Sequence, residues 1–206
     1  MEFGTIIGII TAIALAIGLP LALRKRKKAG PQKREELYRH LQILAVKASL
    51  TERGSDKEQI GLSRFSGQRS EGVIELKNRN VDSINVISIS SQYGVNYFID
   101  YLVKSPNLAG SRLLKKTRLV RKKSSLLSGK TITLEWKGDE SLAWSLNLDH
   151  RLADKLSQDM VHPFKGTIWI YPELKYGYVR IRTSYSLPSI QVIEAVDIIA
   201  RHVKSY

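Results

Sequence analysis

The sequence predicts an α+β protein in which one N-terminal transmembrane helix precedes a mainly antiparallel sheet with helices packed on one face. Three observations predict it. A run of 21 uncharged residues begins near the N-terminus, segments of alternating apolar and polar residues lie between turn residues further along, and two stretches carry apolar residues at helical spacing. About 170 residues follow the first 36, enough for one domain with a hydrophobic core.

The composition limits the chemistry. Hydrophobic residues make up 43% of the chain and charged residues 25%, which is typical of a folded protein. With no cysteine, disulfides, thiolate metal sites and cysteine nucleophiles are excluded. The net charge is +14, and only seven of the 33 Lys and Arg residues lie in the first 34 positions. A basic surface therefore extends over the body of the protein and favours anionic partners.

The apolar run from Phe3 to Leu23 has the length of a membrane span. As a helix it covers about 31 Å, close to the ~30 Å hydrocarbon core. Only Glu2 precedes it, and five consecutive cations follow it: Arg24, Lys25, Arg26, Lys27 and Lys28. Because cations stay on the cytoplasmic side, we expect a single-pass cell-membrane protein with its N-terminus outside and its body in the cytoplasm. A cleaved signal peptide has its charges before a shorter apolar core, and a soluble helix this long usually has a polar face, so both alternatives are less favoured.

Small residues recur at every fourth position of this run, and they share one face of the expected helix: Gly4, Gly8, Ala12 and Ala16. Such a groove lets another helix approach closely. It predicts packing against a second copy or another membrane protein. Chance is the alternative, because Gly and Ala are common in membrane helices.

After the cations, Ala29-Gly30-Pro31 is expected to break the helix. A second helix is expected from Glu35, with one apolar face made of Leu37, Tyr38, Leu41, Leu44, Ala45 and Ala48. It is expected to lie against the body or along the membrane. Residues 51–70 are polar and contain three glycines, which indicates a linker or long loop. The chain therefore divides into an anchor with its basic flank (1–28), a juxtamembrane helix and linker (29–70) and an α+β domain (71–206).

Strands are predicted over residues 73–77, 84–90 and 95–101, the last with the clearest alternation. Two hairpins follow. The first pairs residues 131–136 with 142–148 and leads into a short helix capped by Asp149.

The second hairpin pairs residues 167–171 with 178–185, and a helix with the apolar stripe Val192, Val196, Ile199 and Val203 follows it. The order strand–strand–helix is thus expected twice, and an antiparallel sheet with helices on one face is the simplest architecture.

Motifs for catalysis or metal binding are absent. Ser128-Gly129-Lys130-Thr131 resembles the end of a phosphate-binding loop, but Ser124 stands where that loop needs glycine, and a strand pattern follows instead of a helix. The four histidines form no metal-ligand pair at helical spacing, and His150 beside Asp149 is expected to face solvent. We therefore expect no cofactor and favour a non-catalytic role.

A basic segment and a hairpin face are the candidate binding surfaces. Residues 112–123 hold seven cations and no acid: Arg112, Lys115, Lys116, Arg118, Arg121, Lys122 and Lys123. They favour contact with anionic lipid, nucleic acid or an acidic protein, unless they are a solvated strand or loop paired with carboxylates elsewhere.

On the last hairpin, Ile168, Ile170, Val179 and Ile181 are expected to face the core, and the opposite face combines aromatics with arginines. That face comprises Trp169, Tyr171, Tyr178, Arg180 and Arg182. Interleaved rings and arginines can stack on bases and hold phosphates. Residues 175–179 resemble part of an RNA-recognition strand, although the glycine after Lys175 is missing and Ile181 replaces the last aromatic. A covering helix or partner subunit is the alternative.

Three functions remain in order of preference. The first is a membrane-anchored, non-catalytic interaction module, an accessory subunit or assembly factor whose basic segments contact acidic lipid or the partner. The second is a membrane-tethered binder of nucleic acid or another polyanion. The third is an enzyme whose site residues are dispersed along the chain.

Overall fold

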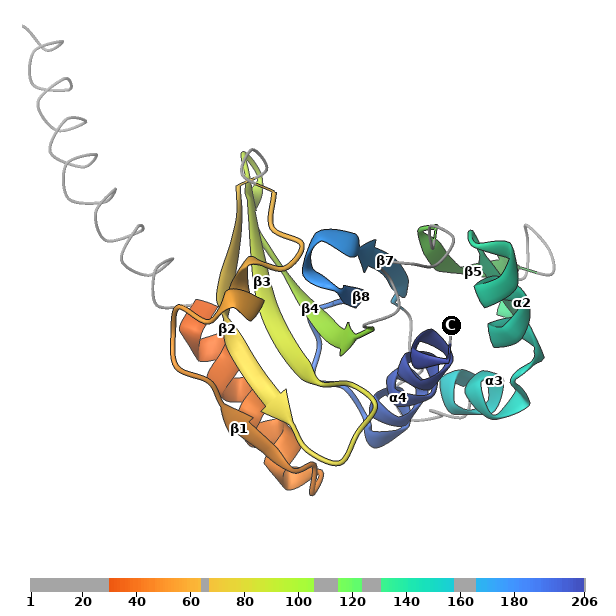
Figure 1. The fold of residues 1–206 in the computed structure, drawn as a ribbon, viewed down its shortest axis with the longest axis horizontal. Helices are drawn as coiled ribbons and strands as arrows, with labels where there is room; N and C mark the ends of the chain where they lie inside the picture. Colours follow the sequence, from red (N-terminus) through yellow and green to blue (C-terminus); the bar gives the residue numbers. More distant parts are fainter. Residues whose placement is uncertain (1–29, 64–66, 106–114, 124–130, 158–165, 206) are drawn as a thin grey trace, which may run out of the picture.

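An eight-stranded open sheet with helices on one side forms the body of the protein (Figure 1). The computed structural model describes residues 30–63, 67–105, 115–123, 131–157 and 166–205, without the side chains of residues 122, 123 and 131–133. The strands are β1 (Ala48–Leu50), β2 (Gln68–Leu76), β3 (Ser83–Ser91), β4 (Gly94–Lys104), β5 (Thr117–Lys123), β6 (Thr131–Lys137), β7 (Trp169–Glu173) and β8 (Tyr178–Ser184). The helices are one over residues 30–43, α2 (Glu140–Leu148), α3 (His150–Ser157) and α4 (Ile190–Lys204), with the 3-10 turns η1 (Asp56–Gln59) and η3 (Leu174–Tyr176).

The strands run in the order β1-β2-β3-β4-β8-β7-β5-β6, and all the described pairs are antiparallel. The first four form a meander, but the neighbour of β4 is β8, which is reached only after β5, β6 and β7. Between β5 and β7 the pairing covers just Thr117 with Ile170 and Arg118 with Trp169. The sheet therefore consists of a broad part and a hairpin, β5–β6, joined to it by a short seam.

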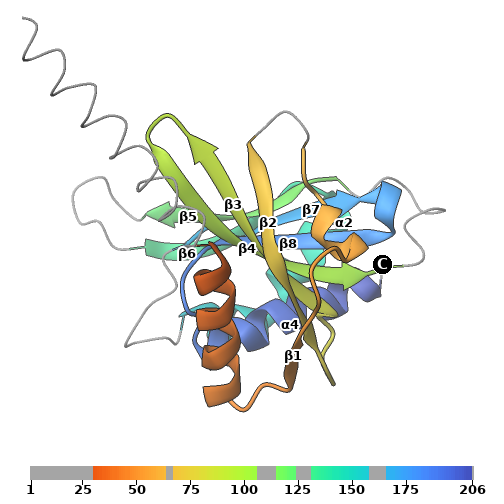
Figure 2. The ribbon, with the colours of Figure 1, turned by 90° about the vertical axis from the view of Figure 1, so that its left-hand side faces the viewer.

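The main core lies between the sheet and the helices. The whole predicted stripe of α4 is buried, from Val192 to Val203, and the Ser189 hydroxyl caps the helix by accepting from the Val192 amide. The helix over residues 30–43 adds Leu37 and Leu41, both fully buried, to the same core. It is tied to the chain leading into α4 because His40 Nε2 lies 2.8 Å from the Pro188 carbonyl oxygen. Figure 2 shows this helix in front of the strands, with α4 running behind its lower end.

The helix over residues 30–43 differs from its prediction at both ends. Gly30 and Pro31 are already helical, before the predicted start at Glu35, and Ala48 belongs to β1. Ala29 and the helix that was expected to break there lie outside the described residues. Ala45 adopts a left-handed conformation with φ of 56°, and the Val46 amide donates to the Leu41 carbonyl at 2.9 Å. This is the C-terminal cap that usually has glycine in the left-handed position. Here alanine takes that position, so the sequence has no glycine that marks the end of the helix.

The first predicted hairpin is wrong in its second half. Residues 142–148 belong to α2, which begins after Asp139, whose carboxylate accepts from the Leu142 amide. The buried residues Leu142, Ala143 and Leu146 follow a helical spacing, while Trp144 and Leu148 are exposed. The true partner of β6 is β5, which lies inside the basic segment.

Other predictions of secondary structure are confirmed. The strands at 73–77, 84–90 and 95–101 fall within β2, β3 and β4 apart from one terminal residue, and the second hairpin is β7–β8. Asp149 accepts from the Leu152 amide at the start of α3. The repeated strand–strand–helix order does occur, but its first unit is β5–β6 followed by α2 and α3, and the second is β7–β8 followed by α4.

A side chain of α2 caps one residue of the edge strand β6. Asn147 accepts from the Trp136 amide at 2.8 Å and donates to the Trp136 carbonyl at 3.2 Å. These two bonds are the ones that a neighbouring strand would make to this residue. At the opposite edge, β1 is only three residues long.

Within the described ranges, which start at residue 30, none of the helices combines the length and hydrophobicity that a membrane crossing requires. The predicted span over residues 3–23 lies outside these ranges, as do its small-residue face and the cations at 24–28.

Candidate functional site

The sheet has one face under the helices and one face away from them, which we call the open face. On β4, Ile99, Tyr101 and Val103 join the main core. Because side chains alternate along a strand, Phe98, Asp100 and Leu102 point to the open face. Asp100 on β4 pairs in register with Arg182 on β8, and Arg182 pairs in turn with Trp169 on β7. The open face therefore continues from β4 across β8 to β7.

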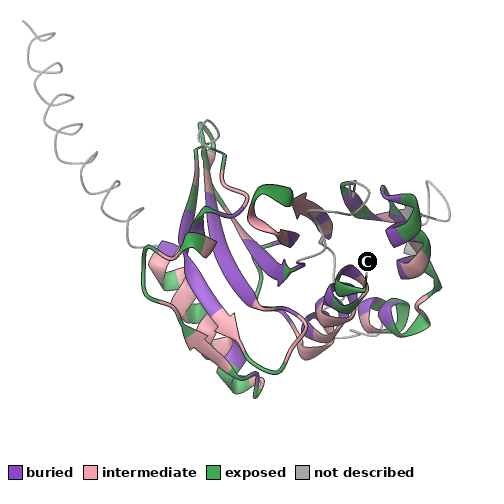
Figure 3. Cartoon of the chain, viewed as in Figure 1, coloured by how far each residue is buried: buried purple, intermediate pink, exposed green. Residues whose placement is uncertain are grey.

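Half of the open face is covered by η1. Val73, Ile87 and Leu102 are fully buried there although they do not belong to the main core, and Ile60 beside η1 is 2% exposed. The buried Asn85 amide donates to the Lys57 carbonyl at 3.2 Å, which holds η1 on β3. The linker predicted over residues 51–70 is therefore a packed cover in this part. Its last residues, 68–70, belong to β2, and the strands beneath it are coloured as buried in Figure 3.

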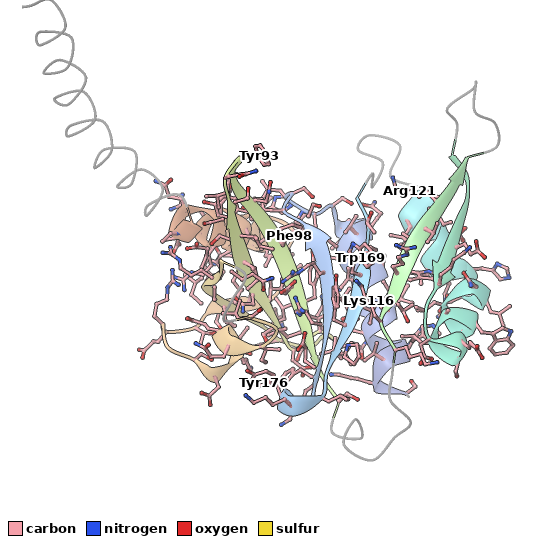
Figure 4. All side chains as sticks on the ribbon, turned by 90° about the horizontal axis from the view of Figure 1, so that it is seen from above. Tyr93, Phe98, Lys116, Arg121, Trp169 and Tyr176 are labelled. Carbon is pink, nitrogen blue, oxygen red and sulfur yellow. The ribbon has the colours of Figure 1, made fainter. Side chains whose placement is uncertain are left out.

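The other half carries rings and cations, and we call it the aromatic–basic face. Its residues are Phe98, Lys116, Arg118, Lys137, Trp169 and Tyr171. Trp169 and Tyr171 stack with centroids 6.2 Å apart and an interplanar angle of 24°. The Lys116 ammonium lies 4.3 Å from the Trp169 centroid and 4.9 Å from that of Tyr171, and the Arg118 guanidinium lies 5.4 Å from Trp169. Figure 4 shows Lys116 and Trp169 close together between β5 and β7.

The two cations of this stack are exposed, while both rings are half-buried. A shallow depression of about 340 Å³ lies between Lys116, Arg118, Lys137, Gly138 and Trp169. Such a surface offers ring faces for stacking and positive charges for carboxylates or phosphates.

A buried ion-pair network lies beside the rings. Asp100 is fully buried and accepts from Arg182 Nε at 2.6 Å and Nη2 at 2.7 Å, and from Arg180 Nη1 at 3.2 Å. Arg180 also donates to Glu173 through Nε at 2.9 Å and Nη2 at 2.7 Å. Burial disfavours the charge of Arg180, but Asp100 and Glu173 outweigh it and raise its pKa above the ordinary value.

The predicted hairpin face is thus assembled, but its arginines are already paired. Ile168, Ile170, Val179 and Ile181 face the core as expected. Arg180 and Arg182 are 6% and 8% exposed. The Tyr171 ring lies against the Arg180 guanidinium and the Phe98 ring against that of Arg182. They neutralise carboxylates of this protein, so the exposed cations of the face are Lys116 just before β5, Arg118 on β5 and Lys137 on β6. The Lys137 ammonium lies 3.5 Å from the Glu135 carboxylate.

Tyr178 lies apart from the stack. It lines a wide cleft of about 1340 Å³ between the η1 segment and the end of the β7–β8 hairpin, together with Tyr176, Lys104 and Lys175. The cleft joins the covered half of the open face to the tip of that hairpin.

Strand alternation divides the basic segment. Lys115, Lys116 and Arg118 are exposed. Arg121 lies on the same face of β5 as the buried Leu119, and burial lowers the pKa of Arg121. Arg112 and the side chains of Lys122 and Lys123 lie outside the described part of the chain. Of its described side chains, Lys116 and Arg118 belong to the aromatic–basic face.

The sequence did not reveal that the two candidate surfaces meet. Arg118 pairs with Trp169 in register, so the basic segment and the last hairpin form one surface across the β5–β7 seam. The wrong partner given to β6 hid this link.

Across the described ranges, no group of three His, Asp or Glu side chains is placed to hold a metal ion. His202 Nε2 lies 2.9 Å from Asp149 Oδ2, whereas His150 is exposed as predicted. Thr131 begins strand β6 where a phosphate-binding loop would need a helix, and residues 124–130 lie outside the described ranges.

No protein-family model matches this chain, and neither a curated protein nor a solved structure matches it.

Proposed function

We propose that this chain is a non-catalytic, membrane-anchored interaction module whose aromatic–basic face binds an acidic surface of a partner protein. The observation that carries the proposal is the Trp169–Tyr171 stack under exposed Lys116 and Arg118. In the described ranges it stands on the part of the sheet that neither a helix nor η1 covers. Aromatic residues and arginine are the residue types that contribute most to binding at protein interfaces.

The anchoring part of the proposal rests on sequence. The uncharged run over residues 3–23 has the length of a span, and the five cations after it favour a cytoplasmic body near anionic lipid. The small-residue face beginning at Gly4 would pack on another helix, from a second copy or from another membrane protein.

Two carboxylates bear on the catalytic alternative. Burial opposes the charge of Asp149, but hydrogen bonds from His202 and the Leu152 amide outweigh it and lower its pKa. The hydrogen bond from Lys33 is the main cause that lowers the pKa of Glu36. A carboxyl group that acts as a general acid at neutral pH needs a raised pKa. The pKa values of Asp149 and Glu36 are lowered, so neither carboxyl group is suited to that role.

The test compares two charge-reversed chains in native membranes. Lys116→Glu with Arg118→Glu changes the aromatic–basic face, and Lys47→Glu with Lys77→Glu makes the same change of net charge at two exposed residues elsewhere. Particles extracted gently are weighed by native mass spectrometry. We expect the wild type and the control to carry an additional polypeptide and the first variant to lose it. Retention of that polypeptide by the first variant would contradict the proposal.

A single-stranded nucleic acid is the second candidate, since stacked rings beside cations also suit bases and phosphates. With Arg180 and Arg182 paired to carboxylates and Lys137 lying 3.5 Å from the Glu135 carboxylate, Lys116 and Arg118 remain as contacts. Two phosphate contacts predict a slope of roughly −1.4 for log K against log salt concentration. Fluorescence anisotropy with an oligonucleotide measures this slope, and absence of binding at low salt removes this candidate.

A further inference from the structure

The β3–β4 hairpin ends in a tyrosine that contacts little of the protein. Tyr93 is 91% exposed at the turn between the two strands. The Tyr93 amide donates to the Ser91 hydroxyl, which in turn donates to the Gly94 carbonyl, each at 3.3 Å. The turn is thus held by hydrogen bonds of its own, and Figure 2 shows the hairpin extending beyond the helices.

This hairpin is uncharged along all of β3, around its turn and along the first part of β4. Residues 83–99 contain no Asp, Glu, Lys or Arg, in a chain where 25% of residues are charged. Its exposed side chains near the turn are Ser90, Ser91, Gln92, Tyr93 and Asn96. Charged side chains at a tip that enters a lipid headgroup region would lose solvation energy, and an uncharged tip avoids this cost.

The described chain begins at the same end of the sheet. A Cβ on Gly30 would overlap the Glu71 carboxyl group, and Glu71 accepts from the Ser88 hydroxyl at 2.6 Å. Ser88 is three residues from Ser91, so the hairpin extends about 10 Å beyond this contact. From Leu23 to Gly30 the chain spans between about 10 Å as a helix and about 24 Å extended. The end of the apolar run is therefore within reach of the plane that contains the hairpin tip.

We infer that the tip of the β3–β4 hairpin, residues 90–96 with Tyr93 at its turn, inserts into the headgroup region of the bilayer that anchors the chain. Tyrosine is enriched at this depth because its ring is apolar and its hydroxyl stays hydrated. The inference rests on the membrane anchor of the proposed function. A second contact, separate from the span, fixes how the body is turned and places the β2–β4 strands upright on the membrane.

The absence of cysteine makes a direct test clean. The full chain with Tyr93→Cys carries a single nitroxide at the tip. The full chain with Lys77→Cys carries a single nitroxide at the exposed turn at the opposite end of β3. Because β3 is nine residues long, this turn lies about 30 Å from the tip. Both chains are reconstituted into phosphatidylcholine vesicles with a fraction of phosphatidylserine. Electron paramagnetic resonance measures the collision rates of each label with oxygen and with a water-soluble nickel chelate, and flotation of the vesicles measures anchoring.

We expect both chains to float, the label at 93 to lose most of its collisions with the chelate while keeping those with oxygen, and the label at 77 to stay accessible to both. Flotation with equal chelate accessibility at 93 and 77 would overturn the insertion and leave the anchor standing. A label at 93 shielded from both reagents would also overturn it, because that indicates a protein contact. Failure to float would reject the anchor itself, and with it the inference.

Discussion

The side chains in the two halves of the open face are buried from solvent in different ways. Over β2, β3 and β4, apolar side chains are buried by η1, a segment that arrives from outside the sheet. Over β8 and β7, the two arginines of β8 are buried by pairing with Asp100 of β4 and Glu173 of β7 and by rings that lie on their guanidiniums. The first half is closed against solvent, while the second still presents half-buried rings and exposed cations. The comparison separates a surface that serves stability from one that is available for binding.

The largest expected effect comes from removing the shared carboxylate of the paired half. Asp100→Asn leaves two buried guanidiniums without their common partner, and we expect a loss of about 3–5 kcal/mol in the free energy of unfolding. Urea denaturation followed by circular dichroism measures it. Asp154→Asn, the same change at an exposed helix residue, is the control and should be nearly neutral. A small effect of Asp100→Asn would mean that the network is not part of the folded framework.

The covered half is tested by shortening its buried cover residue. Ile60→Ala removes three buried carbons beneath η1, and we expect a loss of about 2–5 kcal/mol in unfolding free energy. Ile43→Ala, at a residue that is 81% exposed, should change little. Equal effects of the two substitutions would show that η1 does not bury this half in solution.

Gly61 lies where the two halves meet. Its φ is +72°, and a Cβ there would overlap the Arg180 guanidinium. Gly61→Ala should cost about 1–2 kcal/mol from backbone strain alone, with a further loss from displacement of Arg180. Gly54→Ala, also at positive φ but with open space around it, isolates the backbone contribution. A larger loss at Gly61 than at Gly54 in urea denaturation is the expected result, and equal losses would mean that Arg180 moves freely.

The smallest expected effect concerns the exposed stack. A double-mutant cycle of Lys116→Met and Trp169→Leu should give a coupling energy of about 0.5–1 kcal/mol, because the site is partly exposed. The same variants should affect partner binding far more than stability. Coupling indistinguishable from zero would place Lys116 free in solvent, without contact to the ring.

The comparison also shows which features the sequence could predict. Alternation predicted both faces of β7–β8 because burial on one side imposes a period of two. It failed for α2, where Leu142, Trp144, Leu146 and Leu148 alternate by chance and the capping residue Asp139 decides the structure. The pairing of Arg180 with Asp100 joins residues 80 positions apart. Contacts of that separation leave no local pattern, so the arginines looked free in the sequence.

The amide of Asn147 has a consequence for assemblies of this protein. An unpaired strand edge is a template on which a second chain can add its own strand. Chains confined to a membrane, as proposed here, would meet one another at high local concentration and in similar orientation. Because Asn147 occupies the outer hydrogen-bonding positions of Trp136 and the other edge is three residues long, both edges offer a shortened template. Crowding on a surface would then favour separate sheets over pairing from edge to edge.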